Sequence, residues 1–329
     1  MWPHLSLIVL IVHGDAGAMM GLSSVNAKTR RPFKGRSFFD VLFGDVALRY
    51  WMLAPAVLVL LLLTVFPYIY ALRMSTLAFR FGKPTGFIGL TNYRDMLTDG
   101  LFWASMGRTV GFSVVVVFVE LILGLILALF ANRITTFRDL VRTGLILPMA
   151  IAPVVVAIIW RTLLNGEFGI LDYVTDEVFH LGRPNWLGDL AFWSMSILDI
   201  WQWTPFMFLV LLAGLQAIPV EMYDAAYVDG ASEFQLLRFV TLPLLNSTIL
   251  VAVLVRTVDA LRIFDQVFLL TAGGPGTTTE FVSLYIYKIA FKFSQMGYAS
   301  SLLLVLFVVT MIMALAYIFF LRRSSEVYS

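Results

Sequence analysis

The sequence contains no cysteine and only three histidines among its 329 residues. The absence of cysteine excludes disulfides, thiolate metal sites and cysteine nucleophiles. The histidines, at positions 4, 13 and 180, lack the spacing of metal ligands, so neither a metal site nor histidine-based catalysis is expected. The chain therefore offers little from which an enzyme active site is usually built.

Charge is also scarce, since only 13% of the residues are charged whereas 60% are apolar. This composition lies outside the range of soluble globular proteins. The 23 basic and 21 acidic residues nearly cancel, so nothing indicates a nucleic-acid partner. Because lipid cannot satisfy backbone amides, a chain this apolar is expected to cross the membrane as helices. The predicted fold class is an all-α integral membrane protein.

Long apolar stretches define the predicted membrane spans. No internal repeat and no Gly/Ser-rich linker divides the chain, which predicts one transmembrane domain, 50–323, between an N-terminal tail, 1–49, and a C-terminal tail, 324–329. The spans expected from stretches of about 20 apolar residues are 50–71, 110–131, 145–164, 190–216, 248–270 and 299–321.

Basic residues next to the predicted spans indicate their orientation. They collect before the first span and at the ends expected on the same side, which predicts that both termini are cytoplasmic. Residues 1–19 include a short apolar run but lack the basic start of a signal peptide, so we expect a dispensable tail or an early start codon. The basic residues on the cytoplasmic side are Lys28, Arg30, Arg31, Lys34, Arg36, Arg49, Arg133, Arg138, Arg142, Arg238, Arg322 and Arg323.

The segment 219–243, between the fourth and fifth spans, carries the clearest local signals. Pro219 suits a first helical turn, and Asp229 followed by Gly230 is expected to end that helix. Ser232 and Gln235 have the spacing of a capping box that starts a second helix. Leu242 and Pro243 are expected to end the element.

The polar face of this segment is acidic. Amphipathic helices on membrane surfaces usually carry Lys or Arg, whereas this segment has only Arg238 against its acidic residues. A surface helix is therefore one interpretation, and a site for another protein is the favoured one, because small residues allow a partner's backbone to approach. The acidic residues are Glu221, Asp224, Asp229 and Glu233, and the small ones are Ala225, Ala226, Gly230 and Ala231.

The segment resembles the cytoplasmic loop of the permease subunits of binding-protein-dependent ABC importers, which reads Glu-Ala-Ala, three residues, Gly and later Leu-Pro. Here Asp224 stands in the place of the usual Glu. The resemblance implies a cytoplasmic coupling helix that docks into a cleft of a separate ATPase subunit. The residues expected in this contact are Glu221, Asp224, Ala225, Ala226, Asp229, Gly230, Ala231 and Pro243.

Three further segments, 87–93, 271–276 and 284–287, resemble the carbohydrate-uptake branch, which includes maltose, trehalose and glycerol-phosphate permeases. This resemblance implies a second homologous permease subunit, two ATPase subunits, an external substrate-binding protein and a bacterial inner-membrane location. The sequence has no phosphate-binding Gly-rich loop followed by Lys and Ser or Thr. We therefore expect no cofactor in this chain, with ATP bound and hydrolysed by a partner.

Charged residues within the fifth span are candidates for the solute pathway, because a charge in lipid costs about 2.5–3.5 kcal/mol on insertion scales unless it is paired or faces a polar cavity. Arg256, Asp259, Arg262 and Asp265 recur every three residues with alternating sign, so each is expected to reach the next along one helix. Helix stabilisation and solute contact both remain open. Asp259 and Arg262 are the preferred solute contacts.

The fourth span combines a carboxylate, an amide and aromatic rings near Pro205. This mixture suits a sugar, whose C–H faces pack on rings while its hydroxyls bond to polar groups. Alternatively, Trp201 and Trp203 are interface anchors. Glu120 is expected to form a hydrogen bond between helices. The candidate solute contacts in this span are Asp199, Gln202, Trp203 and Phe206.

The predicted function is that of the transmembrane pathway subunit of an ATP-driven importer for a sugar or polyol. The acidic neighbours of the arginines favour a neutral solute, and glycerol phosphate is the alternative within this class. An ion-coupled secondary transporter is the alternative of a different class, although the inverted repeats that it predicts are not evident. A membrane enzyme is a third class, for which the residues give little support.

Overall fold

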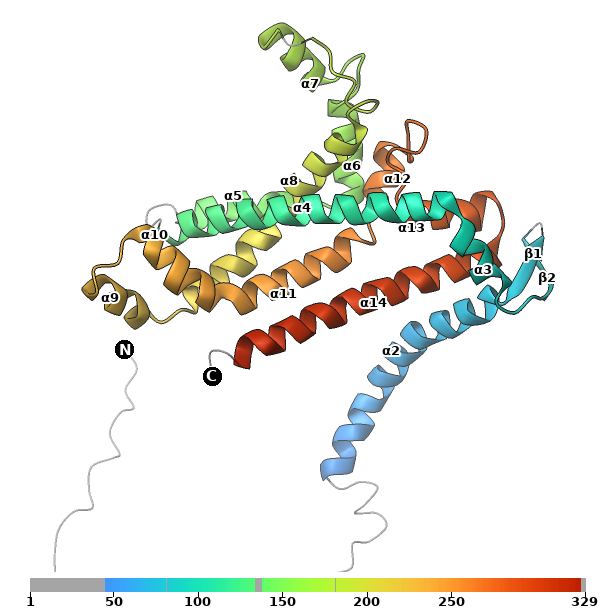
Figure 1. Cartoon of the computed structure of the whole chain (residues 1–329), viewed down its shortest axis with the longest axis horizontal. Helices are drawn as coiled ribbons and strands as arrows, with labels where there is room; N and C mark the ends of the chain where they lie inside the picture. Colours follow the sequence, from blue (N-terminus) through green and yellow to red (C-terminus); the bar gives the residue numbers. More distant parts are fainter. Residues whose placement is uncertain (1–44, 81, 134–137, 181, 327–329) are drawn as a thin grey trace, which may run out of the picture. The chain divides into compact units, whose positions relative to one another are not determined.

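The computed structural model describes residues 45–80, 82–133, 138–180 and 182–326 (Figure 1). Contacts divide the chain into two units, 1–61 and 62–329. The described part of the first unit, 45–61, lies within helix α2 (Asp45–Ser75). The prediction for residues 1–19 and most of the predicted N-terminal tail fall outside the described residues.

The described residues are mostly helical, with loops between the helices and one antiparallel hairpin in which Leu77 pairs with Phe87. Five helices are long and apolar enough to cross a membrane, or up to six if one bent helix pair counts as a span. The prediction of an all-α membrane fold with about six spans is confirmed. The elements after α2 are β1 (Leu77–Arg80), β2 (Lys83–Phe87), α3 (Thr91–Thr98), α4 (Gly100–Arg133), α5 (Arg138–Ala150), α6 (Pro153–Leu163), α7 (Ile170–Tyr173), η1 (Val174–Val178), α8 (Ala191–Gln216), α9 (Val220–Val228), α10 (Glu233–Leu236), η2 (Leu237–Thr241), α11 (Leu242–Ala260), α12 (Asp265–Leu270), α13 (Val282–Tyr287), η3 (Lys288–Lys292) and α14 (Met296–Glu326).

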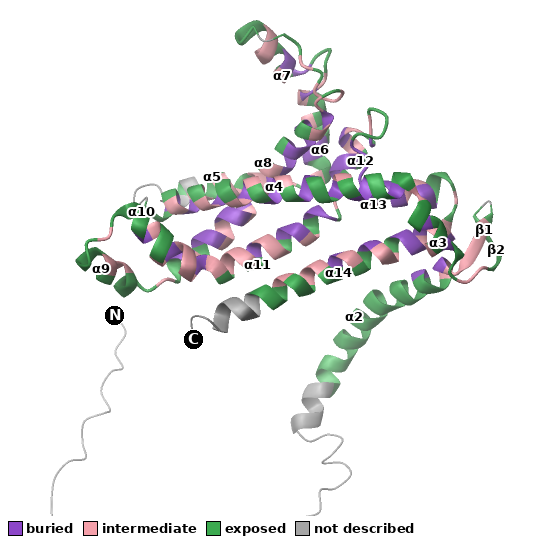
Figure 2. Cartoon of the chain, in the orientation of Figure 1, coloured by how far each residue is buried: buried purple, intermediate pink, exposed green. Residues whose placement is uncertain are grey.

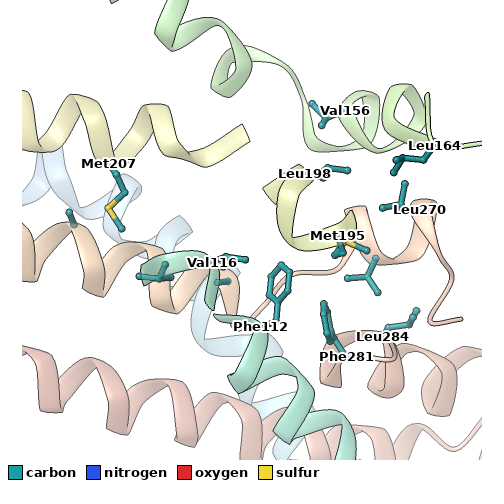
Figure 3. Close-up of a cluster of buried hydrophobic side chains, with 14 residues drawn as sticks. Phe112, Val116, Val156, Leu164, Met195, Leu198, Met207, Leu270, Phe281 and Leu284 are labelled. Carbon is teal, nitrogen blue, oxygen red and sulfur yellow. The ribbon is translucent and has the colours of Figure 1, made fainter. Parts of the chain in front are cut away.

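The core of the second unit forms where α4 packs against α8. The buried side chains concentrate on these two helices and on the elements that cross them (Figure 2). Gly124 brings the backbones close together, since a Cβ added to it would lie 2.6 Å from Cβ of Met207. Phe112 packs on Phe281 with ring centroids 4.8 Å apart, and Met195 and Leu198 join the same cluster (Figure 3). Small residues at such crossings are typical of helix packing in membranes.

The third predicted span, 145–164, is wrong as a single helix. The structure has α5 and α6 instead, which meet at an angle of 94° across a break at 151 and 152. Ala152 adopts an extended ψ of 136° directly before Pro153. A proline disfavours the helical conformation of the residue before it and is well accommodated in a first helical turn, so Pro153 ends one helix and starts the next.

The fifth predicted span, 248–270, is also interrupted. Helix α11 ends at Ala260, a turn follows, and α12 starts at Asp265. The expected ladder of four charges along one helix is therefore wrong beyond Asp259. Arg262 lies in the turn and donates from Nε to the carbonyl of Val258 at 3.1 Å, and Asp265 lies on the next helix.

Candidate coupling segment and solute pathway

The first half of segment 219–243 folds as its sequence predicts. Pro219 caps α9 with φ −59° and ψ 137°, and Asp229 ends it. Gly230 follows with φ +79°, in the left-handed region that favours glycine. The N–H of Ala231 then bonds to the carbonyl of Ala226 at 3.0 Å. Two predicted helix boundaries are thus confirmed.

The candidate contact residues of α9 and the following turn lie on the surface. None of the residues of α9 is buried. Ala226 and Ala231 are half-buried, and Pro243 is half-buried within a helix rather than on this surface. The exposed candidates are Glu221, Asp224, Ala225, Asp229 and Gly230. This surface offers carboxylates beside residues with little or no side chain, which suits contact with another macromolecule.

The second half of the segment continues into the candidate membrane span Glu233–Ala260. Ser232 and Gln235 form the predicted capping box, in which the N–H of Ser232 donates to Oε1 of Gln235 at 2.8 Å. Leu242 and Pro243 do not end the element, which corrects the prediction. The backbone widens into the π-helical turn η2, where the N–H of Leu242 bonds to the carbonyl of Leu237. This widening accommodates Pro243, whose ring would clash with the preceding turn of a regular α-helix.

An ion pair joins segment 219–243, the candidate coupling segment, to α4. Glu233, the first residue of α10, pairs with Arg133, the last residue of α4. Its Oε1 also accepts a hydrogen bond from the hydroxyl of Tyr227 at 3.0 Å, which raises the pKa of that tyrosine. The sequence analysis missed this link because Arg133 and Glu233 lie 100 residues apart. The two short helices are thereby tied to each other and to α4.

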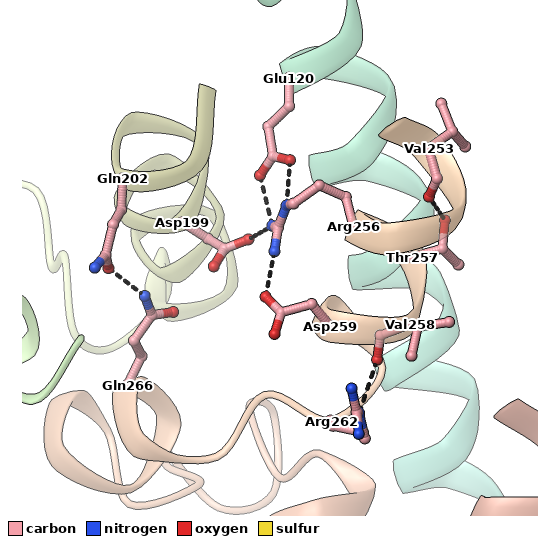
Figure 4. A network of polar contacts seen from close by, with 10 residues as sticks. All are labelled: Glu120, Asp199, Gln202, Val253, Arg256, Thr257, Val258, Asp259, Arg262 and Gln266. Carbon is pink, nitrogen blue, oxygen red and sulfur yellow. Dashed lines mark hydrogen bonds and ion pairs between the residues drawn. The ribbon is translucent and has the colours of Figure 1, made fainter. Parts of the chain in front are cut away.

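Arg256 is the centre of a buried ion cluster that connects α4, α8 and α11 (Figure 4). It donates to Glu120 through Nε at 2.7 Å and through Nη2 at 2.8 Å. Nη2 also donates to Asp199 at 2.7 Å, and Nη1 donates to Asp259 at 2.6 Å. The prediction that Glu120 bonds between helices is confirmed.

The cluster differs in exposure from one carboxylate to the next. The side chains of Arg256, Glu120 and Asp199 are at most 2% exposed, whereas that of Asp259 is 50% exposed. The guanidinium of Arg256 also lies 5.0 Å from the ring centroid of Trp203. Charges buried this deeply are tolerated only when they are paired and hydrogen-bonded. Asp259 therefore occupies the boundary between the cluster and accessible space.

A small polar pocket of about 140 Å³ opens beside the cluster. It brings together four of the six candidate solute contacts, Asp199, Trp203, Asp259 and Arg262. Gln202 and Phe206 are not part of its lining. Because ligand pockets usually measure about 300–1,000 Å³, this pocket can enclose only part of a solute. The remaining lining residues are Pro153, Ala260, Ile263, Phe264, Asp265 and Gln266.

Two hydrogen-bonded glutamines lie beside this pocket, and one of them bonds to the backbone at a helix break. Nε2 of Gln202 donates to the carbonyl of Ile151, at the break between α5 and α6, at 3.0 Å. Oε1 of Gln202 accepts from Nε2 of Gln266 on α12 at 2.7 Å. Irregular backbone at membrane depth persists only where polar partners replace the lost hydrogen bonds. Gln202 thus holds the wall of the pocket, and Gln266 is a lining residue that the sequence analysis missed.

A second polar cluster lies just outside α4. Asp99 accepts hydrogen bonds from the hydroxyls of Tyr285 and Tyr298, each at 2.6 Å, and from the backbone N–H groups of Leu101 and Phe102. Partial burial opposes ionisation of Asp99, but these hydrogen bonds outweigh it and lower its pKa. The carboxylate therefore ties the start of α4 to α13 and α14.

Known proteins share this architecture. A family model for the inner membrane component of binding-protein-dependent transport systems matches residues 120–325. The trehalose/maltose transport system permease protein MalF of Thermococcus litoralis is 36% identical over 281 residues, covering 84% of this chain and 94% of that protein. The sulfoquinovosyl glycerol transport system permease protein SmoG of Agrobacterium fabrum is 35% identical over 286 residues, covering 85% and 92%.

A solved structure agrees with these relatives. The permease chain in the crystal structure of a bacterial ABC transporter that imports the acidic polysaccharide alginate superposes with a TM-score of 0.73. It is 25% identical, and the match covers 84% of this chain and 95% of that chain. The resemblance of segment 219–243 to the coupling loop of ABC permeases agrees with this assignment. The chain belongs to the family of binding-protein-dependent transport system inner membrane components, the permease subunits of ABC importers.

Proposed function

We propose that this chain forms the solute pathway of an ATP-driven sugar importer. Segment 219–243, the coupling segment, would transmit conformational changes of a separate ATPase subunit to this pathway. One observation carries the proposal. The helix that begins at the exposed, acidic coupling segment continues without interruption from Glu233 to Ala260, where it ends beside the polar pocket. One helical element therefore connects a surface suited to a cytoplasmic partner with a site suited to a solute.

The partners follow from membership of the family. The exposed carboxylates of Glu221, Asp224 and Asp229 and the open surroundings of Gly230 support docking of a separate ATPase subunit, which binds and hydrolyses ATP. A second homologous permease would complete the small pocket, with two ATPase subunits below and an external binding protein above. The chain would lie in the bacterial inner membrane with both termini in the cytoplasm.

A neutral sugar fits the pocket better than an anion does. Three aspartates, Asp199, Asp259 and Asp265, line it against the single cation Arg262. The other nearby cation, Arg256, already binds three carboxylates, so it has no free fork for a phosphate. Trp203 adds an aromatic ring of the kind that packs on sugar C–H groups. Two permeases named for trehalose are among the relatives, at 36% and 34% identity.

Reconstitution of the complete transporter tests the proposal. The chain is assembled with its permease, ATPase and binding-protein partners in proteoliposomes, and uptake of radiolabelled trehalose is measured. We expect uptake to require ATP and the binding protein and to be unaffected by an ionophore. Uptake that persists without ATP and collapses with an ion gradient would instead establish a secondary transporter. Competition by excess glycerol phosphate, but not by maltose, would overturn the choice of a neutral sugar.

A further inference from the structure

Two residues of the pocket wall, Asp259 and Trp203, are held by the same side chain, that of Arg256. Asp259 and Trp203 both line the pocket, and both contact Arg256, which itself does not line it. Arg256 holds Oδ2 of Asp259, while Oδ1 has no hydrogen-bond partner among the described residues. The free oxygen of a fixed carboxylate can accept a hydrogen bond from a hydroxyl in the pocket.

The support is itself fixed from two other helices. Glu120 on α4 engages Arg256 through both of its oxygens, and Asp199 on α8 engages the same Nη2 atom (Figure 4). Such bidentate pairs hold a guanidinium in one plane as well as at one place. The side chain of Arg256 thus has little freedom to turn, and the position of Asp259 follows from it.

Lysine could not reproduce this arrangement. Its ammonium is a single point on a flexible stem, whereas the guanidinium presents its donors in a rigid, planar fork. The fork reaches three carboxylates on different sides, and its central carbon lies over the ring of Trp203. The site therefore uses the planar shape of the guanidinium as well as its charge.

We propose that Arg256 is a positioning residue that holds Asp259 and Trp203 as a carboxylate-and-aromatic wall for one uncharged sugar ring, with Glu120 as its anchor. The proposal rests on the proposed solute pathway and deepens it. Asp259 accepts hydrogen bonds from ring hydroxyls, and Trp203 packs on the ring's C–H groups. Neither Arg256 nor Glu120 touches the solute, so each acts only through Asp259 and Trp203.

The absence of cysteine provides a direct assay for this wall. Ile263 lines the pocket beside Asp259, and Ile263→Cys would be the only thiol in the chain. The complete transporter carrying this change is treated with a thiol reagent in proteoliposomes, and labelling of this chain is followed by mass spectrometry. Trehalose is the probe, and the concentration that halves the labelling rate is compared between variants that share the same binding protein, so that differences report occupancy of the pocket.

Three variants in this background separate positioning from stability. Asp259→Asn and Arg256→Lys are each expected to raise the half-protecting concentration about tenfold or more, the scale of a lost charge-assisted hydrogen bond. Glu120→Asp, which shortens the anchor by one methylene and lies outside the pocket, is expected to raise it severalfold. In the Asp259→Asn background, most of the effect of Arg256→Lys should disappear, because the two changes act through one contact.

Matched controls make the same chemical changes elsewhere. Arg161→Lys alters an arginine that donates to the carbonyl of Leu269 and does not line the pocket. Glu280→Asp shortens a buried glutamate that pairs with Lys288 at 2.5 Å. Both should leave the half-protecting concentration unchanged.

The outcomes distinguish the two levels of the proposal. If trehalose, maltose and other neutral sugars fail to protect the thiol introduced by Ile263→Cys in otherwise unchanged transporters, the proposed pathway is wrong. The proposed sugar-binding wall is then refuted as well. If trehalose protects but Glu120→Asp and Arg256→Lys transporters that assemble retain the original concentration, the pathway stands and the positioning role is refuted. Should Arg256→Lys not assemble, Glu120→Asp alone decides between these results.

Discussion

The coupling segment and the Arg256 cluster differ in the exposure of their charges and in how far apart the contacting residues lie in the sequence. The coupling segment keeps its carboxylates exposed, and its shape depends on contacts such as the one between Ser232 and Gln235, three residues apart. In the cluster most of the charges are buried, and Arg256 bonds to Asp199 and Glu120, which lie 57 and 136 residues away in the sequence. A surface that meets another protein needs accessible groups on a locally defined backbone. Charges within a membrane need neutralising partners that only the tertiary fold can bring together.

The largest effect on stability is expected at the cluster. Arg256→Ala would leave Glu120 and Asp199 buried without their cation, which should cost about 3–5 kcal/mol of unfolding free energy. The yield and the thermal unfolding midpoint in detergent measure this loss. Arg161→Ala, which removes an exposed arginine, is the control and should change both little. Equal losses in the two variants would remove the distinction between the cluster and the surface.

At the coupling segment the expected loss is functional. Gly230→Trp should abolish uptake by the complete transporter while the separate ATPase still hydrolyses ATP. The backbone cost of a side chain at φ +79° is about 1–2 kcal/mol, too small to unfold the chain. Gly182 has the same φ of +79° and similarly open surroundings, so Gly182→Trp is a matched control that should retain uptake. Loss of uptake in both variants would implicate strain instead of docking.

Asp99 is an intermediate case, because its carboxylate is partly buried and bonded across long sequence distances. The pKa of Asp99 is lowered in the folded protein. The hydrogen bonds of its carboxylate therefore contribute stability above the ordinary aspartate pKa of about 3.9, and this stability is lost as the pH falls through the lowered value. Asp99→Asn should reduce stability by about 1–2 kcal/mol at neutral pH. Unfolding midpoints of both proteins should converge below about pH 4. A constant difference across this range would contradict the assignment.

The smallest effect is expected at the cap of α10. Ser232→Ala removes the side-chain acceptor of the capping box and should cost about 0.5–1 kcal/mol. Ser300→Ala removes a hydroxyl that donates to the carbonyl of Met296 within α14 and serves as the control. Thermal unfolding compares them, and uptake should fall only slightly in either variant. If Ser232→Ala lowered the unfolding free energy as much as Arg256→Ala, contacts between residues close in sequence would dominate the stability of this fold.

Local chemistry explains which parts of the fold could be predicted. Pro219, Gly230 and the capping box set helix boundaries through bonds within a few residues, and the structure has those boundaries. Pro243 was misjudged because proline usually interrupts a helix, whereas the π-helical turn before it lets the helix continue. Two prolines lie in the third predicted span, and only Pro153 stands at a helix break, because Pro148 lies within α5 without ending it. Proline alone therefore does not show where this span is interrupted.

The solute pathway could be predicted less well. The spacing of Arg256, Asp259 and Arg262 indicated a ladder, which required α11 to continue past Ala260. Nothing in the spacing identifies Glu120 or Asp199 as the partners of Arg256, because each comes from another helix. The candidates Asp199, Trp203, Asp259 and Arg262 do meet at one pocket, whereas the contact of Gln202 with Gln266 depends on two helix breaks. Whether a solute binds there stays a prediction.

The helix from Glu233 to Ala260 is long enough to act as a lever arm. Its 28 residues give it a length of about 42 Å, and Arg256 lies roughly 35 Å from the end that carries the coupling segment. A tilt of about 5° around that end would carry Arg256 sideways by about 3 Å, more than the 2.7 Å that separates it from Asp199 on α8. A small tilt at the end near segment 219–243 would thus be enough to make or break a single ion pair between helices.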